Sequence, residues 1–204
     1  MKRACEKVYS SKETINSKQD VFVGKKIYEH MKKVIFIAVL LVVFSGFKSL
    51  NRVDKIIAKE IKEVFEIENF NKEIVEIPIE VNSSLPVKIS ETNFYKLTAN
   101  QEYIGYYYFG QAYGKADFFD FIVILNKDLI VSKVKIITYR EDHGGEVGSK
   151  RWLKQFIGTD YNQELKYQKD IAAISGATIS AKSMTNQVNR FLKTISMLHN
   201  KELL

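Results

Sequence analysis

The spacing of hydrophobic residues predicts two amphipathic helices, one on either side of a stretch of strand-like segments. Residues 50–66 place Val53, Ile57, Ile61 and Val64 on one face, with Lys and Glu on the other. Residues 180–198 give the strongest helix prediction in the chain. Their apolar stripe consists of Met184, Val188, Phe191, Leu192, Ile195 and Leu198.

Four segments between these helices have the composition of β-strands. They are residues 74–81, 103–109, 118–125 and 129–139. The first alternates apolar and acidic side chains, and Pro78 favours an edge position because proline donates no ladder hydrogen bond. The last two are joined by Asn126-Lys127-Asp128, whose residue types favour a short hairpin turn.

Two shorter elements lie between these strands and the last helix. Residues 149–157 predict a short helix that ends at Gly158, and residues 171–174 predict a short extended piece. Together the elements favour an α+β fold, in which an antiparallel sheet is flanked by helices.

The composition supports one globular domain with an appendage. The chain has 204 residues, of which 46% are hydrophobic, and its 13 Phe and 11 Tyr supply a core. Residues 1–33 carry most of the net charge of +7, with 9 Lys and Arg against 4 Asp and Glu. The other 22 basic and 20 acidic residues leave the folded part nearly neutral, so we expect no nucleic-acid partner.

The N-terminal region is expected to direct the protein to a membrane. Residues 34–47 are an uncharged apolar run, with Lys33 before it and Lys48 after it. This length fits a signal peptide better than a spanning helix of about 20 residues, although snorkelling lysines would allow a membrane anchor. Residues 1–33 form a basic segment, which either includes sequence upstream of a true start at Met31 or is a cytoplasmic tail.

Cysteine usage favours export. The only cysteine, Cys5, precedes the apolar run, so the rest of the chain has no thiol to oxidise. We therefore expect the folded domain to face the periplasm or the outside. It is either tethered to the cytoplasmic membrane or secreted after signal cleavage.

The best candidate for chemistry is the segment Ser175-Gly176-Ala177-Thr178-Ile179-Ser180, just before the long helix. Gly176 and Ala177 are small enough for a ligand to approach the backbone, and the unpaired amides of a helix start favour a phosphate. The Thr178 hydroxyl could serve as an N-cap, as a hydrogen-bond donor to a phosphate, or as the oxygen of a phosphoester. From the residues alone, the N-cap is the commonest of the three.

This segment resembles the flavinylation motif of the FMN-binding domain family. The family includes the C subunit of the sodium-pumping NADH:quinone reductase, the G subunit of the Rnf complex and exported single-domain proteins. The resemblance also covers residues 139–145 (YREDHGG) and residues 152–158 (WLKQFIG). It implies an FMN-binding domain over residues 101–198, preceded by a helix and edge-strand extension over residues 50–100.

The resemblance implies a role for each residue of the motif. Thr178 would be esterified to the phosphate of FMN by a separate flavin transferase outside the membrane. Around that phosphate, Ser175, Gly176 and Ala177 would shape the backbone, while Ser180 would help to cap the helix.

Three residues of the upstream block, Glu141, Gly144 and Gly145, match the loop that borders the flavin in relatives. A plain strand-to-helix turn explains these three residues equally well. Two aromatic groups, Trp152 with Phe156 and the tyrosines 106–108, are candidates to cover or stack on a flavin ring, but packing in the core is the expected role of both.

One departure from the family pattern concerns attachment of the flavin. The family usually has Asp three residues before Ser175, whereas this chain has Ala172, and the nearest acid is Asp170. If the transferase requires that Asp, covalent attachment fails while the fold is kept.

The resemblance therefore implies a membrane-tethered flavoprotein that relays electrons rather than an enzyme acting alone. Its partners would be the flavin transferase and a membrane oxidoreductase or an extracytoplasmic electron acceptor. Two alternatives stay open: a non-redox binding module that has lost covalent FMN, and a small flavin reductase of a diffusible acceptor.

Overall fold

The computed structural model describes Lys32 and residues 52–204. The fold described below lies in Val53–Leu204, one of the two units into which the chain divides. The predicted basic segment and the apolar run at 34–47 lie outside the described residues. Among the helices that are described, none combines the length and the apolar character needed to cross a membrane.

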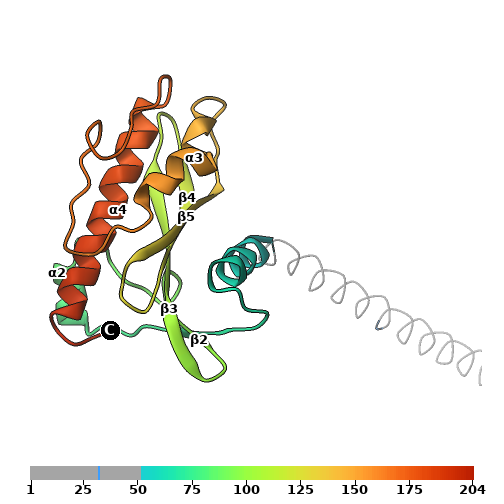
Figure 1. The fold of residues 1–204 in the computed structure, drawn as a ribbon, viewed down its shortest axis with the longest axis vertical. Coiled ribbons are helices and arrows are strands. Elements are labelled where there is room, and N and C mark those ends of the chain that lie inside the picture. Colours follow the sequence, from blue (N-terminus) through green and yellow to red (C-terminus); the bar gives the residue numbers. More distant parts are fainter. Residues whose placement is uncertain (1–31, 33–51) are drawn as a thin grey trace, which may run out of the picture. The chain divides into compact units, whose positions relative to one another are not determined.

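Five antiparallel strands form a single sheet and follow one another in the order of the sequence (Figure 1). They are β1 (Asn71–Ile74), β2 (Phe94–Ala99), β3 (Glu102–Tyr113), β4 (Phe118–Leu125) and β5 (Val131–Thr138). This arrangement, with the helices below, confirms the predicted α+β class.

The helices differ in length and place. They are α2 (Ile79–Ser84), the 3₁₀ turn η1 (Gly145–Gly148), α3 (Lys150–Leu153), the 3₁₀ turn η2 (Lys154–Phe156) and α4 (Thr178–His199). Residues 52–65 are also helical, as the apolar spacing predicted. The helix predicted at 149–157 is α3 continued by η2, with Ser149 as N-cap and Gly158 at a left-handed φ of 88° after its end.

The sheet is covered on both faces, and β4 shows why. Its residues Phe119 and Phe121 belong to the larger core cluster, which also holds the apolar stripe of α4. The alternate residues Ile122 and Ile124 belong to a second cluster with Ile57 of the helix at 52–65. Because successive side chains of a strand point to opposite faces, α4 and the N-proximal helix cover opposite faces of the sheet.

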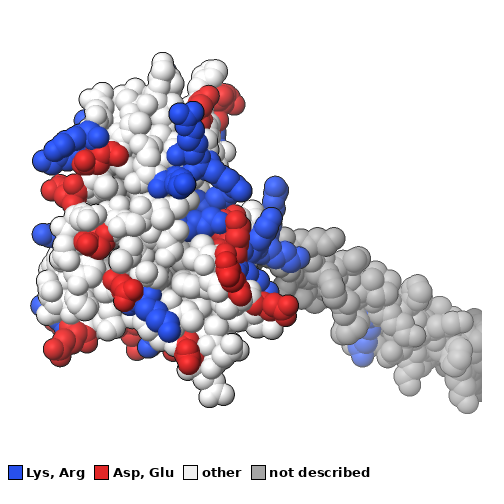
Figure 2. All heavy atoms as spheres, viewed as in Figure 1, with Lys and Arg blue, Asp and Glu red and all other residues white. Residues whose placement is uncertain are grey.

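An ion-pair cluster fastens the helix at 52–65 to β5. The Lys133 ammonium lies 2.6 Å from Glu60 and 3.2 Å from Glu63, and Lys135 lies 3.6 Å from Glu60. The Glu60 and Lys133 side chains are only 10% and 19% exposed. Basic and acidic side chains are mixed over the face of the molecule shown in Figure 2.

The prediction of one edge strand over residues 74–81 is wrong in most of its length. Strand β1 is at the edge of the sheet but ends at Ile74, and Pro78 is instead the N-cap of α2, where its carbonyl accepts a hydrogen bond from Asn82 N. Proline favours this place because it has no N–H to satisfy. The apolar alternation misleads because Ile79 is 83% exposed.

The extended piece predicted at 171–174 is present only as one isolated bridge, between Tyr167 and Ile171. Ile171 is fully buried and anchors the segment to the core. The segment therefore runs as an irregular connection toward the start of α4.

Candidate functional site

A surface pocket of about 450 Å³ lies where α4 begins, at the end of the sheet where β3 turns into β4 and β5 ends. Three segments line it: the β3–β4 loop, the loop after β5 and the first turn of α4. The lining residues are Lys115, Ala116, Arg140, Glu141, Asp142, His143, Gly176, Ala177, Thr178, Ile179 and Ser180. Two of the segments that carry the family resemblance thus lie on one pocket.

The start of α4 leaves three amides without an acceptor inside the helix. The first intrahelical bond runs from Ala181 N to Ala177 O at 2.9 Å, so the N–H groups of residues 178–180 precede it. The helix dipole adds positive potential at the same place. This end of α4 therefore suits an anion.

Thr178 is the first helical residue and not the N-cap. Ala177 occupies the N-cap position, with φ −126° and ψ 27°, and no side chain caps the helix. Thr178 is exposed, and its hydroxyl makes no hydrogen bond to any of the described residues. The N-cap role that the residues alone favoured is thus excluded, and the hydroxyl is available to a ligand.

The backbone before Thr178 leaves room for a close approach. Gly176 has a φ of +80°, and a Cβ built on it would meet no atom within 4 Å. The buried Ala177 packs against the upstream loop, since a Cβ at Gly144 would lie 3.1 Å from the Ala177 Cβ. A larger side chain at Gly144 would push this loop away from the motif, and the φ of +81° at Gly144 itself favours glycine.

A polar network joins the three segments beneath the pocket. The Glu141 carboxylate accepts hydrogen bonds from the backbone amides of Ala116 and Asp117, the second at 3.2 Å. The Tyr139 hydroxyl lies 3.3 Å from Glu141 Oε2, 2.9 Å from the His143 carbonyl and 3.3 Å from Ser180 Oγ. The pKa of Glu141 lies below its ordinary value. The hydrogen bond from the Ala116 amide lowers this pKa most, burial raises it, and the hydrogen bond from the Asp117 amide lowers it further.

Counting protons assigns the direction of these hydrogen bonds. Tyr139 has one phenolic proton, and the Glu141 carboxylate and the His143 carbonyl can only accept. Ser180 therefore donates to Tyr139, which donates its own proton to one of the two acceptors. Ser180 is buried and committed to this network, so the expected capping role of Ser180 is wrong.

Two basic side chains line the pocket, and they differ in their bonding to other residues. Arg140 is held on the protein, where its guanidinium pairs with Asp120 and donates a 2.9 Å hydrogen bond to the Phe118 carbonyl. The exposed Lys115 side chain makes no ion pair or hydrogen bond within the described part of the chain. Lys115 is therefore the cation free to meet a phosphate.

The structure does not bring every expected residue to the pocket wall. Ser175 is exposed and does not line the pocket, and neither Gly144 nor Gly145 does, although Gly144 supports Ala177 from below. Asp170 also lies away from the pocket, because its carboxylate accepts a 2.8 Å hydrogen bond from Lys166 N within a local turn. The Asp170 side chain is therefore bonded within that turn.

The aromatic residues considered for the flavin ring are core residues, as expected. Trp152 and Phe156 are buried and contact each other edge to face at 5.3 Å. The three tyrosines 106–108 are buried in β3, and Tyr108 stacks on Phe191 at 4.3 Å. Among the residues that do line the pocket, six were not predicted as site residues: Lys115, Ala116, Arg140, Asp142, His143 and Ile179.

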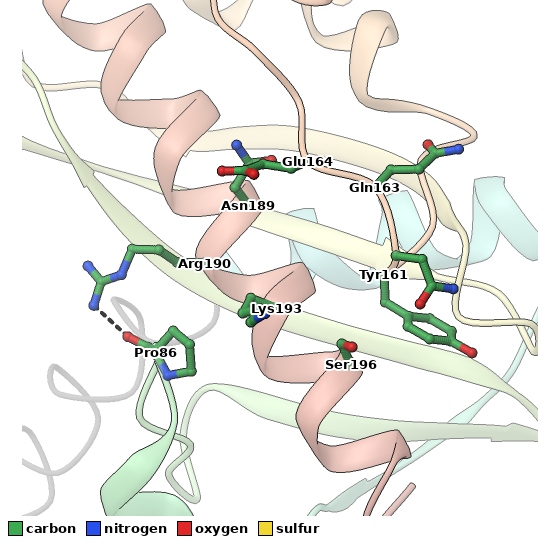
Figure 3. Close-up of a pocket in the computed structure, with 9 residues that line it drawn as sticks. Pro86, Tyr161, Gln163, Glu164, Asn189, Arg190, Lys193 and Ser196 are labelled. Carbon is green, nitrogen blue, oxygen red and sulfur yellow. Dashed lines mark hydrogen bonds between the residues drawn. The ribbon is translucent and has the colours of Figure 1, made fainter.

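A larger pocket of about 570 Å³ lies elsewhere, between α4 and residues 161–164 (Figure 3). Its Arg190 side chain donates a hydrogen bond to the Pro86 carbonyl. The Asn189 amide is occupied by the backbone of Leu165, with bonds of 3.0 and 2.7 Å. This pocket has neither the helix start nor the free hydroxyl found near Thr178, so we assign the site to the smaller pocket.

Residues 114–193 match the family model of the FMN-binding domain. Over these residues the chain matches the FMN-binding domain family, in agreement with the resemblance seen in the sequence. The matched region contains β4, β5, α3, most of α4 and the whole wall of the 450 Å³ pocket. A comparison with curated proteins finds none that matches the chain.

Proposed function

We propose that this protein is an electron-transfer flavoprotein that holds FMN in the pocket at the start of α4, with the phosphate esterified to Thr178. The observation that carries the proposal is the exposed Thr178 hydroxyl beside three free helix amides, on the wall of a pocket within the FMN-binding domain. These donors fit a phosphate dianion. When bound, FMN supplies the redox chemistry.

The residues of this chain hold and orient the group. The amides of residues 178–180 would bind phosphate oxygens. The Lys115 ammonium would neutralise the part of the phosphate charge that the helix dipole does not. Gly176 gives the ligand access to the backbone. Attachment would break the Thr178 O–H bond and form an O–P bond, with an activated form of FMN losing its leaving group and the transferase accepting the proton.

The same proposal includes the place of the protein in the cell. The apolar run at 34–47 would export the domain and keep it on the outer side of the cytoplasmic membrane, unless the run is cleaved. There a covalent bond prevents loss of a cofactor that is hard to replace. The proposed partners are the flavin transferase and a membrane oxidoreductase or extracytoplasmic acceptor.

Intact mass and in-gel flavin fluorescence test the attachment. The full chain from host membranes should gain the mass of FMN less one water, and the fluorescence should survive denaturation. Thr178→Ala should lose both signals, whereas Thr178→Ser keeps a hydroxyl and should retain them in part. Wild-type protein with neither signal would favour the non-redox module or loosely bound flavin, and turnover without a partner protein would favour the small reductase.

A further inference from the structure

We infer that Glu141 is a positioning residue: its carboxylate fixes the β3–β4 loop as one wall of the pocket and, through Tyr139, links that wall to the turn that carries Thr178. The inference deepens the proposed function and rests on it, because the pocket is taken to hold FMN. It gives Glu141 a task other than direct contact with the flavin.

The β3–β4 loop depends on Glu141 for its middle part. The loop is held at its ends by the bond from Gly114 N to Asp117 O at 2.8 Å and by the bond from Tyr113 N to Ser183 Oγ at 3.0 Å. Between these anchors, the amides of Ala116 and Asp117 have no acceptor other than Glu141 among the described residues. Ala116 lines the pocket, so the carboxylate sets the position of the wall.

Because Gly114 has no side chain, the Glu141 carboxylate has room to reach the loop. A Cβ at Gly114 would lie 2.6 Å from both the Glu141 carboxyl carbon and Oε1. Such a distance is too short for real atoms, so any side chain at Gly114 must displace the carboxylate. The structure therefore offers a second way to break the same contact, with Glu141 left unchanged.

The link from Glu141 to the helix runs through two hydroxyl groups. Tyr139 lies 3.3 Å from the Glu141 carboxylate and 3.3 Å from Ser180 Oγ, and Ser180 is two residues after Thr178. Hydrogen bonds to an ionised group are stronger than neutral ones. When Tyr139 donates to Glu141 and not to the His143 carbonyl 2.9 Å away, the charge on Glu141 stabilises the relative position of two walls that come from distant parts of the chain.

Two measurements on the full chain, expressed without flavin transferase, test the inference. Hydrogen–deuterium exchange reports on peptides that cover residues 114–118, and flavin fluorescence reports the Kd for added FMN. Glu141→Ala should speed exchange of this loop and raise the Kd, each by about tenfold. Glu141→Gln keeps one acceptor oxygen and should recover part of both, while Gly114→Ala should resemble Glu141→Ala.

Glu146→Ala is the matched control. Glu146 is an exposed residue of η1 and lies outside the pocket wall, and its carboxylate makes no hydrogen bond or ion pair among the described residues. It should leave both measurements within about twofold of wild type.

Three results would count against these claims in distinguishable ways. If the wild type binds FMN and Glu141→Ala binds it equally well, the inference is overturned, even if the loop exchanges faster. If Glu146→Ala has the same effect as Glu141→Ala, general loop charge and not the Glu141 contact is responsible, which also overturns it. If the wild type binds no added FMN, the pocket role of Glu141 is overturned, while the proposed function is decided separately by the mass and fluorescence test of covalent attachment.

Discussion

The indole nitrogen of Trp152 donates a 2.8 Å hydrogen bond to the carbonyl of Ala172. The amide of the same Ala172 donates a 2.8 Å hydrogen bond to Gln155 Oε1, and Gln155 Nε2 bonds to the Trp152 carbonyl at 2.9 Å. Both backbone groups of one residue are therefore clamped by the short helix at 150–156. Ala172 lies three residues before Ser175, so this clamp fixes the connection that leads to Thr178.

The clamp predicts a defined stability loss. Gln155→Ala removes the acceptor of the Ala172 amide and should lower the free energy of unfolding by about 1 kcal/mol. Lys154→Ala is the control, since Lys154 is an exposed neighbour whose side chain makes no hydrogen bond or ion pair in the described chain, and it should change the value by less than about 0.5 kcal/mol. Urea unfolding measures both, and equal values for the two variants would disprove the clamp.

Ala172→Asp is predicted to restore the acid usual in the family without changing the fold. The Ala172 side chain is exposed, so the substitution should alter the free energy of unfolding by no more than about 0.5 kcal/mol. If the transferase contacts this position, the flavinylated fraction seen by intact mass should rise. Ala173→Asp, one exposed residue further on, is the control and should leave the fraction unchanged.

The Glu141 contacts predict a pH-dependent stability difference. Because the pKa of Glu141 is lower in the folded state than its ordinary 4.5, its ionised form stabilises the fold fully above that value. The contribution is lost as pH falls through the lowered pKa. Around the carboxylate lie the hydroxyl of Tyr139 and the backbone of Lys115, Ala116 and Asp117.

Thermal unfolding of wild type and Glu141→Gln should therefore differ near pH 7 and converge below about pH 4. Glu146→Gln should follow the wild-type curve throughout. A difference between wild type and Glu141→Gln that persists unchanged at pH 3 would contradict the role of the ionised carboxylate.

The ion-pair cluster between the helix at 52–65 and β5 lies on the sheet face away from α4. We expect its loss to cost more stability than the loss of an exposed surface pair. Glu60→Ala removes the 2.6 Å partner of the largely buried Lys133, which keeps only Glu63 at 3.2 Å, and should lower the free energy of unfolding by about 2 kcal/mol. Lys62→Gln, at an exposed position of the same helix, should change it by less than about 0.5 kcal/mol. Chemical denaturation of the full chain measures both free energies of unfolding. Equal values for the two variants would show that the ion pair contributes nothing.

Strong periodic patterns predicted their elements well, and short or irregular ones did not. The strand at 118–125 and the long C-terminal helix are continuous apolar or striped segments, and both are present. The sequence pattern does not predict β2, because Lys96 interrupts it and the pairing register shifts between Leu97 and Thr98. A bulge of this kind breaks the alternation on which strand prediction depends.

The site was predictable where residues are close in sequence. Thr178 and Gly176 come from one motif, and Glu141 comes from a second segment that the family resemblance identified. Lys115 and Ala116 reach the pocket only because the pairing of β3 with β4 places their loop beside Glu141. No local pattern marks such residues, since their neighbours are set by the sheet and not by the sequence around them.

The order of the strands has a consequence for assembly. Each strand pairs with the one before it in the chain, so the sheet needs only local contacts and we expect it to form early. The pocket requires α4, whose first residue follows the end of β5 by a long connection. The pocket is therefore completed last, and retained flavin would mark molecules that have finished folding, not those with a sheet alone.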